Sequence, residues 1–232
     1  MTTEPGFGVV RSSSLTVPEA ATPRGYRLAK RSLDLVGSLL GLLLVSPILA
    51  VVAAAVKLES RGPVFFRQER LGLGGRPFTL YKFRSMFSSA EQDRHRDHVR
   101  DLIRGDASDA SAAEAVWTPI LADPRVTRLG AFLRRSHLDE LPQLINIVRG
   151  EMSLVGPRPP IPYEVEVYEA RHLPRLSVIP GLTGLWQATG WGRLSFDEGV
   201  ALDLAYIQRR SFWFDVGLIL RTLGQIATGR QF

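Results

Sequence analysis

One uncharged stretch of 22 residues, from Leu35 to Val56, constrains this chain more than any other feature of its sequence. A straight helix of that length is roughly 33 Å long, enough to cross the hydrocarbon core of a bilayer. Pro47 follows Ser46 near the middle of the stretch, where a proline removes a backbone hydrogen bond and bends or breaks a helix. Neither half is long enough to cross a bilayer alone. The stretch therefore predicts a membrane segment with a break or kink at Ser46-Pro47.

Basic residues flank this stretch in equal number, four before it and four after it. They are Arg24, Arg27, Lys30 and Arg31 on one side, and Lys57, Arg61, Arg67 and Arg70 on the other. Because flanks rich in lysine and arginine stay in the cytoplasm, both ends of the stretch are expected there. A re-entrant helix that dips into one leaflet and returns satisfies both observations. A transmembrane helix with a proline kink is the alternative.

Composition limits the classes of partner. Of the 232 residues, 45% are hydrophobic and 22% are charged, which predicts a folded core rather than a disordered chain. Cysteine is absent, so disulfide scaffolds, thiolate nucleophiles and cysteine-bound metals are excluded. The net charge of +6 favours anionic partners, namely nucleic acid, phosphorylated substrates or an acidic membrane surface.

Shifts in composition divide the chain into regions. Residues 1–23 are rich in proline and serine and predict a flexible tail, and residues 24–60 hold the membrane segment with its flanks. Residues 61–232 form the remaining domain. Within it, residues 88–122 predict a polar, variable excursion. Residues 211–228 predict a C-terminal helix whose aromatic residues gather at one end, typical of an amphipathic helix at a membrane surface or of a buried core helix.

A glycine-rich connection, LGLGGR, joins the runs VFFRQER and PFTLYKFRSM and predicts a β-hairpin. On the second strand, Lys82 and Arg84 share one face because side chains alternate along a strand. Two cations on one face suit the binding of phosphates, and a solvated strand face is the alternative.

An adjacent pair of carboxylates, Asp139-Glu140, stands between two helical stripes of apolar residues. Ser136 with Asp139 resembles a capping box, while Pro142 suits a first helical position. The two cues disagree about the first helical residue, but both place the pair near a helix N-terminus. The positive end of the helix dipole there favours ionised carboxylates. Alone, the pair is also typical of a solvated helix start.

Three later motifs complete the pattern. Prolines on both sides of Arg158 stiffen the backbone and favour a guanidinium held ready for bidentate phosphate contact, with an ordinary proline-rich connection as the alternative. The run PGLTGLWQ, which ends at Gln187, predicts a tight loop. Ser195 with Glu198 predicts a capping box that opens a helix.

Five ordered blocks together resemble the bacterial sugar transferase family, the monotopic phosphoglycosyl transferases that prime glycans on polyprenyl phosphate. The blocks cover nearly everything from Lys30 to Leu223. They are KRSLDLVGSLLGLLLVSPIL, GPVFFRQERLGLGGRPFTLYKFRSM, DPRVTRLGAFLRRSHLDELPQLINIVRGEMSLVGPRP, PGLTGLWQATG and LSFDEGVALDLAYI.

The resemblance implies an α+β fold: a mostly helical monotopic membrane protein with a small β-hairpin and an N-terminal re-entrant helix broken at Ser46-Pro47. It implies that residues 61–232 form a catalytic domain at the cytoplasmic face of a bacterial inner membrane. The activity implied is transfer of a sugar 1-phosphate from a UDP-sugar to polyprenyl phosphate, with release of UMP, as the first membrane step of exopolysaccharide synthesis. The implied partners are these substrates and inner-membrane lipid, without nucleic acid, and homo-oligomerisation is left open.

In the family, the aspartate of an Asp-Glu dyad attacks the β-phosphorus and forms a covalent phosphosugar intermediate with Mg²⁺ at the site. The resemblance therefore implies Asp139 as nucleophile and Mg²⁺ ligand, and Glu140 as its acid/base or metal-organising neighbour. Trp191 stands where many members have arginine, which puts the sugar preference in doubt. The candidate residues for binding substrate and phosphate are Lys82, Arg84, Arg134, Arg158, Gln187 and Arg193.

Two rival hypotheses belong to other functional classes. A basic membrane-surface protein would bind anionic lipid or nucleic acid by charge alone and would have no use for Asp139 as a nucleophile. A metal-dependent phosphatase would use the same carboxylates but would release inorganic phosphate rather than UMP. The two are distinguished from transfer by the product that is released.

Overall fold

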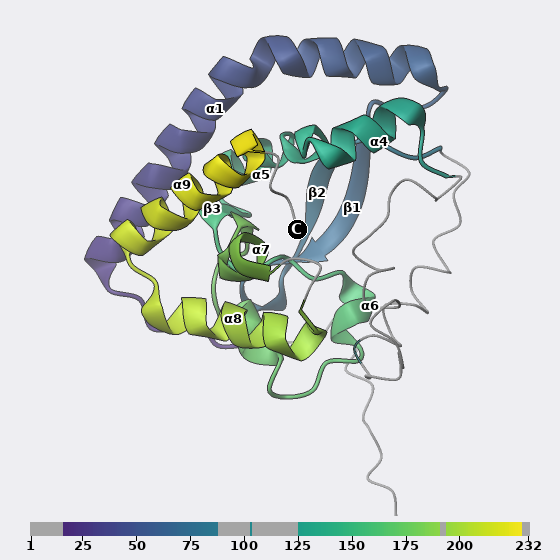
Figure 1. The fold of residues 1–232 in the computed structure, drawn as a ribbon. Coiled ribbons are helices and arrows are strands. Elements are labelled where there is room, and N and C mark those ends of the chain that lie inside the picture. Colours follow the sequence, from purple (N-terminus) through teal and green to yellow (C-terminus); the bar gives the residue numbers. More distant parts are fainter. Residues whose placement is uncertain (1–15, 88–102, 104–124, 191–193, 229–232) are drawn as a thin grey trace, which may run out of the picture.

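The computed structural model describes residues 16–87, 103, 125–190 and 194–228 (Figure 1). The predicted excursion over residues 88–122 lies outside the described residues except for Ile103, and Arg193 and Trp191 lie outside them too. The described chain is mostly helical, with two small sheets of two strands each.

A single helix, α1 (Arg24–Glu59), runs along one edge of the molecule and bends along its length (Figure 1). The predicted break at Ser46-Pro47 is not an interruption in the structure, because helical backbone continues on both sides of Pro47. Proline has no N–H to donate to the Leu43 carbonyl, and the Ser46 hydroxyl donates to that oxygen at 2.8 Å instead. The serine thus pairs a carbonyl that proline would otherwise leave unpaired in apolar surroundings.

Among the described helices, α1 alone is long and apolar enough to cross a membrane. Only 11% of the residues in its most apolar 18-residue window are buried against the rest of the chain. Large apolar side chains such as Leu43, Leu44 and Val51 are exposed along it. In a water-soluble domain, other elements would cover the apolar surface of a core helix. The surface of α1 is not covered in this way, which supports membrane association.

The predicted hairpin is confirmed. Strands β1 (Phe65–Leu71) and β2 (Pro77–Phe83) pair antiparallel, with Phe66 opposite Lys82. The turn between them is the short 3-10 helix η2 (Leu73–Gly75), in which Gly74 has a φ of 68°, a conformation that glycine adopts without strain.

Of the remaining elements, η3 and α5 pack against β2, and α6 packs against β1. Strands β3 and β4 pair in parallel and form the second sheet, which no sequence pattern predicted. The elements and their bounds are α4 (Arg128–Arg135), η3 (Leu138–Glu140), α5 (Gln143–Arg149), β3 (Ser153–Val155), α6 (Pro162–Val165), η4 (Leu173–Ser177), β4 (Gly181–Thr183), α7 (Leu185–Gly190), α8 (Phe196–Arg209) and α9 (Phe212–Thr228).

One predicted helix feature of the C-terminal region is confirmed. The capping box that opens α8 is present: Glu198 N donates to Ser195 Oγ, and the Glu198 carboxylate accepts from Ser195 N at 2.8 Å. Helix α9 is amphipathic, because Asp215 and Leu218 are buried whereas Trp213 is exposed.

Residues 16–23, predicted as the end of a flexible tail, instead contact the folded domain. Val17 N donates to Gly74 O in the hairpin turn at 3.3 Å. Ala20 N donates to Ser177 O at the end of η4 at 2.9 Å. These contacts place the start of α1 next to the domain that follows it. The first 15 residues lie outside the described part of the chain.

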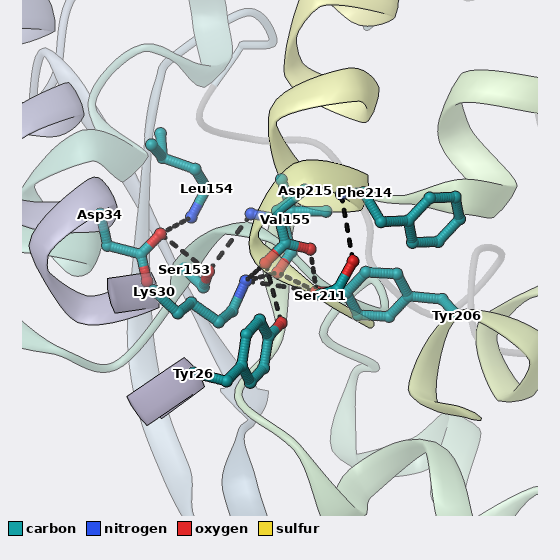
Figure 2. Close-up of polar contacts among 10 residues, drawn as sticks. All are labelled: Tyr26, Lys30, Asp34, Ser153, Leu154, Val155, Tyr206, Ser211, Phe214 and Asp215. Carbon is teal, nitrogen blue, oxygen red and sulfur yellow. Dashed lines mark hydrogen bonds and ion pairs between the residues drawn. The ribbon is translucent and has the colours of Figure 1, made fainter. Parts of the chain in front are cut away.

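A buried polar network joins α1 to β3 and α9 (Figure 2). At its centre is Asp215, whose side chain is 0% exposed. Lys30 Nζ donates to Asp215 Oδ2 and to Val155 O, both at 2.9 Å. The hydroxyls of Tyr26 and Tyr206 each donate to the same carboxylate at 2.8 Å. The charge of Asp215 is therefore balanced by one cation and two hydroxyl donors.

Another buried carboxylate, Asp34 of α1, fixes that helix against β3. Asp34 Oδ1 accepts from Ser153 Oγ at 2.9 Å and from Leu154 N at 2.8 Å (Figure 2). Because β3 leads through Gly156 to Arg158, these bonds set the position of α1 relative to one of the predicted phosphate-binding residues.

Candidate active site

The Asp139-Glu140 pair lies in η3, a single turn of 3-10 helix between α4 and α5, and Asp139 is 7% exposed. His137, just before this turn, has φ 53° and ψ 15°, and no other described non-glycine residue has a positive φ. Such a conformation is strained for a residue with a Cβ and is common at functional sites. His137 was missed by the sequence analysis, because nothing in the local pattern marks a left-handed residue there.

The predicted capping box of Ser136 and Asp139 is wrong. The Ser136 hydroxyl donates backward to Phe132 O at 2.9 Å, so it closes α4 rather than opening the next helix. Helix α5 begins at Gln143, and Pro142 takes the position before its first residue. The carboxylates do precede a helix, as predicted, but a separate turn holds them.

Lys82 is the direct partner of the pair. Its Nζ donates to Glu140 Oε1 at 2.5 Å, and both side chains are partly exposed. Because Lys82 comes from β2 and Glu140 from η3, this ion pair joins the hairpin to the strained turn.

The two carboxyl groups differ in electrostatic environment. Burial raises the pKa of Asp139 to about 6, although the positive charges of Lys82 and Arg134 act to lower it. Burial also acts to raise the pKa of Glu140, but Lys82 and Arg158 outweigh that effect and hold it at about 2. Glu140 is thus a fixed anion near neutral pH, whereas Asp139 is a buried and more basic carboxylate. Neighbouring acids with separated pKa values are typical of catalytic pairs.

Arg134 reaches the site from α4. Its Nε donates to Ser85 Oγ at 2.8 Å, just past the end of β2. Gly130 lets α4 approach so closely, since a Cβ at that position would lie 2.0 Å from Ser85 O. Helix α4 and the segment after β2 therefore meet at a glycine. This contact positions Arg134, whose positive charge acts on Asp139.

Arg158 follows β3, and its charge acts on Glu140. Together with Lys82 and Arg134, it gives the dyad three cations from three separate segments of the chain. All three were among the residues predicted to bind phosphate. Anionic substrate would meet a positive field here, which is the requirement for attack of a carboxylate on a phosphoryl group.

Arg84 does not belong to this site, which corrects the sequence prediction. The prediction assumed that the strand continues to Arg84, but β2 ends at Phe83, so Arg84 does not share the face of Lys82. Its guanidinium instead donates to backbone carbonyls at the C-terminal end of α1 and in the following turn. The acceptors are Val56 O at 3.1 Å, Ser60 O at 2.7 Å and Pro63 O at 2.6 Å.

Gln187 lies on α7 beside the loop that leads to Arg158. A Cβ on Gly184 would lie 2.6 Å from Gln187 Oε1 and 2.3 Å from Gly156 O, so the two segments meet at that glycine. Gln187 Oε1 is buried, and among the described residues it has no hydrogen-bond partner. An unpaired buried acceptor is available to a donor group on a ligand.

Comparison with known proteins identifies the family of the chain. A family model described as bacterial sugar transferase matches residues 25–229. The chain belongs to the bacterial sugar transferase family. The family match takes in the whole of the site described above, from Lys82 to Gln187, together with α1 except for its first residue.

Relatives within the family differ in length. The exopolysaccharide production protein ExoY of Rhizobium meliloti is 39% identical over 94% of this chain and 95% of its own. The UDP-glucose:undecaprenyl-phosphate glucose-1-phosphate transferase of Escherichia coli is 42% identical over 85% of this chain but 40% of its own. The galactosyl transferase CpsE of Streptococcus agalactiae is 40% identical over 88% of this chain and 43% of its own. The chain thus spans less than half the length of the latter two relatives.

Proposed function

We propose that this chain transfers a sugar 1-phosphate from a UDP-sugar to polyprenyl phosphate and releases UMP. The names of relatives support the reaction class, since the Escherichia coli protein is a UDP-glucose:undecaprenyl-phosphate glucose-1-phosphate transferase. One structural observation carries the proposal: Asp139 is a buried carboxylate of raised pKa under the charges of Lys82 and Arg134. A site of this kind can attack a phosphoryl group.

In the proposed reaction, a carboxylate oxygen of Asp139 attacks the β-phosphorus of the UDP-sugar. A bond forms between Asp139 and that phosphorus, and the bond from phosphorus to the bridging oxygen breaks, so that UMP leaves with the electron pair. A phosphate oxygen of the polyprenyl phosphate then attacks the same phosphorus and releases the Asp139 carboxylate. Lys82, Arg134 and Arg158 neutralise the charge on the phosphoryl oxygens in both steps.

Glu140 supports this chemistry by holding Lys82. With a pKa of about 2, Glu140 has no proton to give near neutral pH, so a role as general acid is disfavoured. Its ion pair instead fixes the Lys82 ammonium beside Asp139. The sequence analysis left both roles open, and the structure favours the organising role.

Mg²⁺ fits this donor set if substrate phosphates share in its coordination. Within the described ranges, no group of three or more His, Cys, Asp or Glu side chains could hold a metal ion. Mg²⁺ commonly binds through one or two carboxylates together with waters and substrate phosphates. Asp139 would hold the ion, and Glu140 would orient the site around it. When bound, the ion would add positive charge at the diphosphate.

For α1 we propose a re-entrant path into one leaflet, with both ends at the cytoplasmic face of a bacterial inner membrane. Support comes from the bend of α1, from the Ser46 hydroxyl that pairs the Leu43 carbonyl, and from basic residues at both ends. The path would keep the dyad at the headgroup level, where the phosphate of a polyprenyl lipid lies. Exposed Trp213 on α9 suits the same boundary.

Single-cysteine labelling tests this topology, because the natural chain has no cysteine. A membrane-impermeant maleimide should leave Arg27→Cys and Arg61→Cys unlabelled in intact spheroplasts and should label both after lysis. Asp197→Cys, on the surface of the catalytic domain, is the control for the cytoplasmic side. Labelling of one end of α1 but not the other in intact spheroplasts would show that the helix spans the membrane.

Product analysis tests the function. The purified protein in nanodiscs with Mg²⁺ and polyprenyl phosphate should release UMP from at least one of UDP-glucose and UDP-galactose, the sugars that the relatives' names suggest. Inorganic phosphate without UMP would indicate a phosphatase. Release of neither product from any UDP-sugar would leave the basic membrane-binding hypothesis in place and would overturn the proposed transfer.

A further inference from the structure

The backbone on either side of Arg158 is held by an unusual set of donors. Three of the four residues from Pro157 to Pro160 are prolines, so this segment has many carbonyls to pair and one N–H to offer. All four of its carbonyls accept hydrogen bonds from other parts of the chain. In order of acceptor, the donors are Gly181 N at 2.8 Å, Arg175 Nη2 at 3.4 Å, Arg70 Nη1 at 2.8 Å and Leu71 N at 2.9 Å.

Two of these donors are buried guanidinium groups. Arg70 is 5% exposed, and its Nε and Nη2 donate to Gln68 Oε1 at 3.0 and 2.7 Å while its Nη1 donates to Pro159 O. Within the part of the chain that the structure describes, all its hydrogen-bond acceptors are neutral. A buried cation without a hydrogen-bonded carboxylate is costly, although the more distant charges of Glu164 and Glu140 act to stabilise this one.

Arg175 is held through both of its Nη atoms. Its Nη2 donates to Asp203 Oδ2 at 2.6 Å and its Nη1 to the Tyr168 hydroxyl at 2.8 Å. The rings of Tyr168, Trp186 and Phe196 lie 5.5 to 5.9 Å from its guanidinium carbon. A guanidinium fixed in this way is a rigid point from which to hold the Arg158 carbonyl.

Burial lowers the pKa of Arg70 to about 10, and repulsion from the positive charge of Arg158 adds to this effect. Repulsion from Arg70 would therefore push Arg158 out of place if its backbone were free to move, although the negative charge of Glu140 attracts it. Bonds to the carbonyls on both sides of Arg158 oppose that movement, and an anionic diphosphate between the two arginines would relieve the repulsion.

We propose that Arg70 and Arg175 are positioning residues that clamp the Arg158 backbone, so that its guanidinium meets the diphosphate of the sugar donor. The inference rests on the proposed function, because it assigns the donor diphosphate as the ligand of Arg158. Neither residue is assigned contact with the reacting atoms. Each acts through Arg158.

A double-mutant cycle tests the clamp. Arg70→Met should weaken binding of UDP-glucose or UDP-galactose roughly tenfold in a chain with Arg158, since loss of preorganisation costs affinity. In an Arg158→Ala chain, the same change should weaken binding less than twofold. Calorimetry in the Asp139→Asn background measures equilibrium binding without turnover, so the result does not depend on the chemical step.

Arg84→Met is the matched control, because Arg84 is also a buried arginine that donates to backbone carbonyls, but at the end of α1. Its effect should be the same with and without Arg158. If Arg70→Met does not fold, Arg175→Lys serves instead, since lysine keeps the charge opposite Asp203 but lacks the planar fork that also reaches Arg158 O.

Equal effects of Arg70→Met in the two backgrounds would show a merely structural role and would overturn the clamp. Coupling in the binding measurement, combined with no UMP release by the unaltered protein, would instead refute the proposed transfer and leave the clamp standing. UMP release by the unaltered protein, combined with no coupling between Arg70 and Arg158 in the binding measurement, would support the proposed transfer and refute the clamp.

Discussion

Asp139→Asn should lower UMP release by roughly a thousandfold or more, the scale expected when a nucleophile is removed. An amide does not form the bond to phosphorus that the proposed reaction needs. Asparagine has the shape of aspartate, and burial already disfavours the charge at this position, so the fold should survive the change. Steady-state UMP release measures the loss, and thermal unfolding measures the fold.

Asp197→Asn is the matched control for Asp139→Asn. Asp197 is half exposed and pairs with Arg171 and His172 on the surface of the domain, so the same chemical change there should leave UMP release nearly unaltered. Full UMP release by Asp139→Asn would mean that the dyad is structural, and the assignment of the nucleophile would be wrong.

Lys30→Met should destabilise the protein by about 3–5 kcal/mol, because it leaves the charge of the buried Asp215 without its cation. The Tyr26 and Tyr206 hydroxyls still donate to Asp215, but hydroxyl donors do not replace the missing charge. A second change, Asp215→Asn in the same chain, should recover part of the loss, because the amide is neutral. Its oxygen can accept from one tyrosine hydroxyl, and its NH2 group can donate to the oxygen of the other. Unfolding in detergent measures each difference.

Lys57→Met provides the comparison at the other end of α1. Among the described residues, Lys57 donates to Gly62 O alone, in an exposed contact, and its removal should cost less than about 0.5 kcal/mol. Equal and small losses for Lys30→Met and Lys57→Met would show that the network in Figure 2 does not fix α1 to the domain.

Local patterns predicted the parts of this fold that depend on near neighbours. The hairpin follows from apolar runs around a glycine-rich turn, and the start of α8 follows from Ser195 and Glu198, which bond across three residues. The dyad stands before a helix, as the sequence indicated, and Pro142 immediately precedes the first residue of α5.

The sequence analysis failed where partners come from distant segments. Lys30 and Asp215 are 185 positions apart, and no local pattern links them. Arg84 was assigned to the phosphate site by strand alternation, but β2 ends before it and α1 offers its carbonyls instead. Strands β3 and β4 have three residues each, too few for a periodic signal.

The positions of Arg70 and Arg175 also lie beyond local reasoning. Arg70 donates to Pro159 O, 89 positions away in sequence, and Arg175 donates to the carbonyl of Arg158 itself, 17 positions away. Arg70 was recognised only as one of several basic residues after the membrane stretch. Its link to the site depends on the packing of β1 against the proline-rich segment, which sequence alone did not show.

The most direct test of the account is the mass of the protein after incubation with a UDP-sugar and Mg²⁺ in the absence of polyprenyl phosphate. The account predicts one sugar phosphate attached to the peptide that contains Asp139, with an equal amount of UMP in solution. The adduct should disappear when polyprenyl phosphate is added. Turnover without any adduct, or an adduct that persists in Asp139→Asn, would contradict the claim that Asp139 carries the phosphosugar.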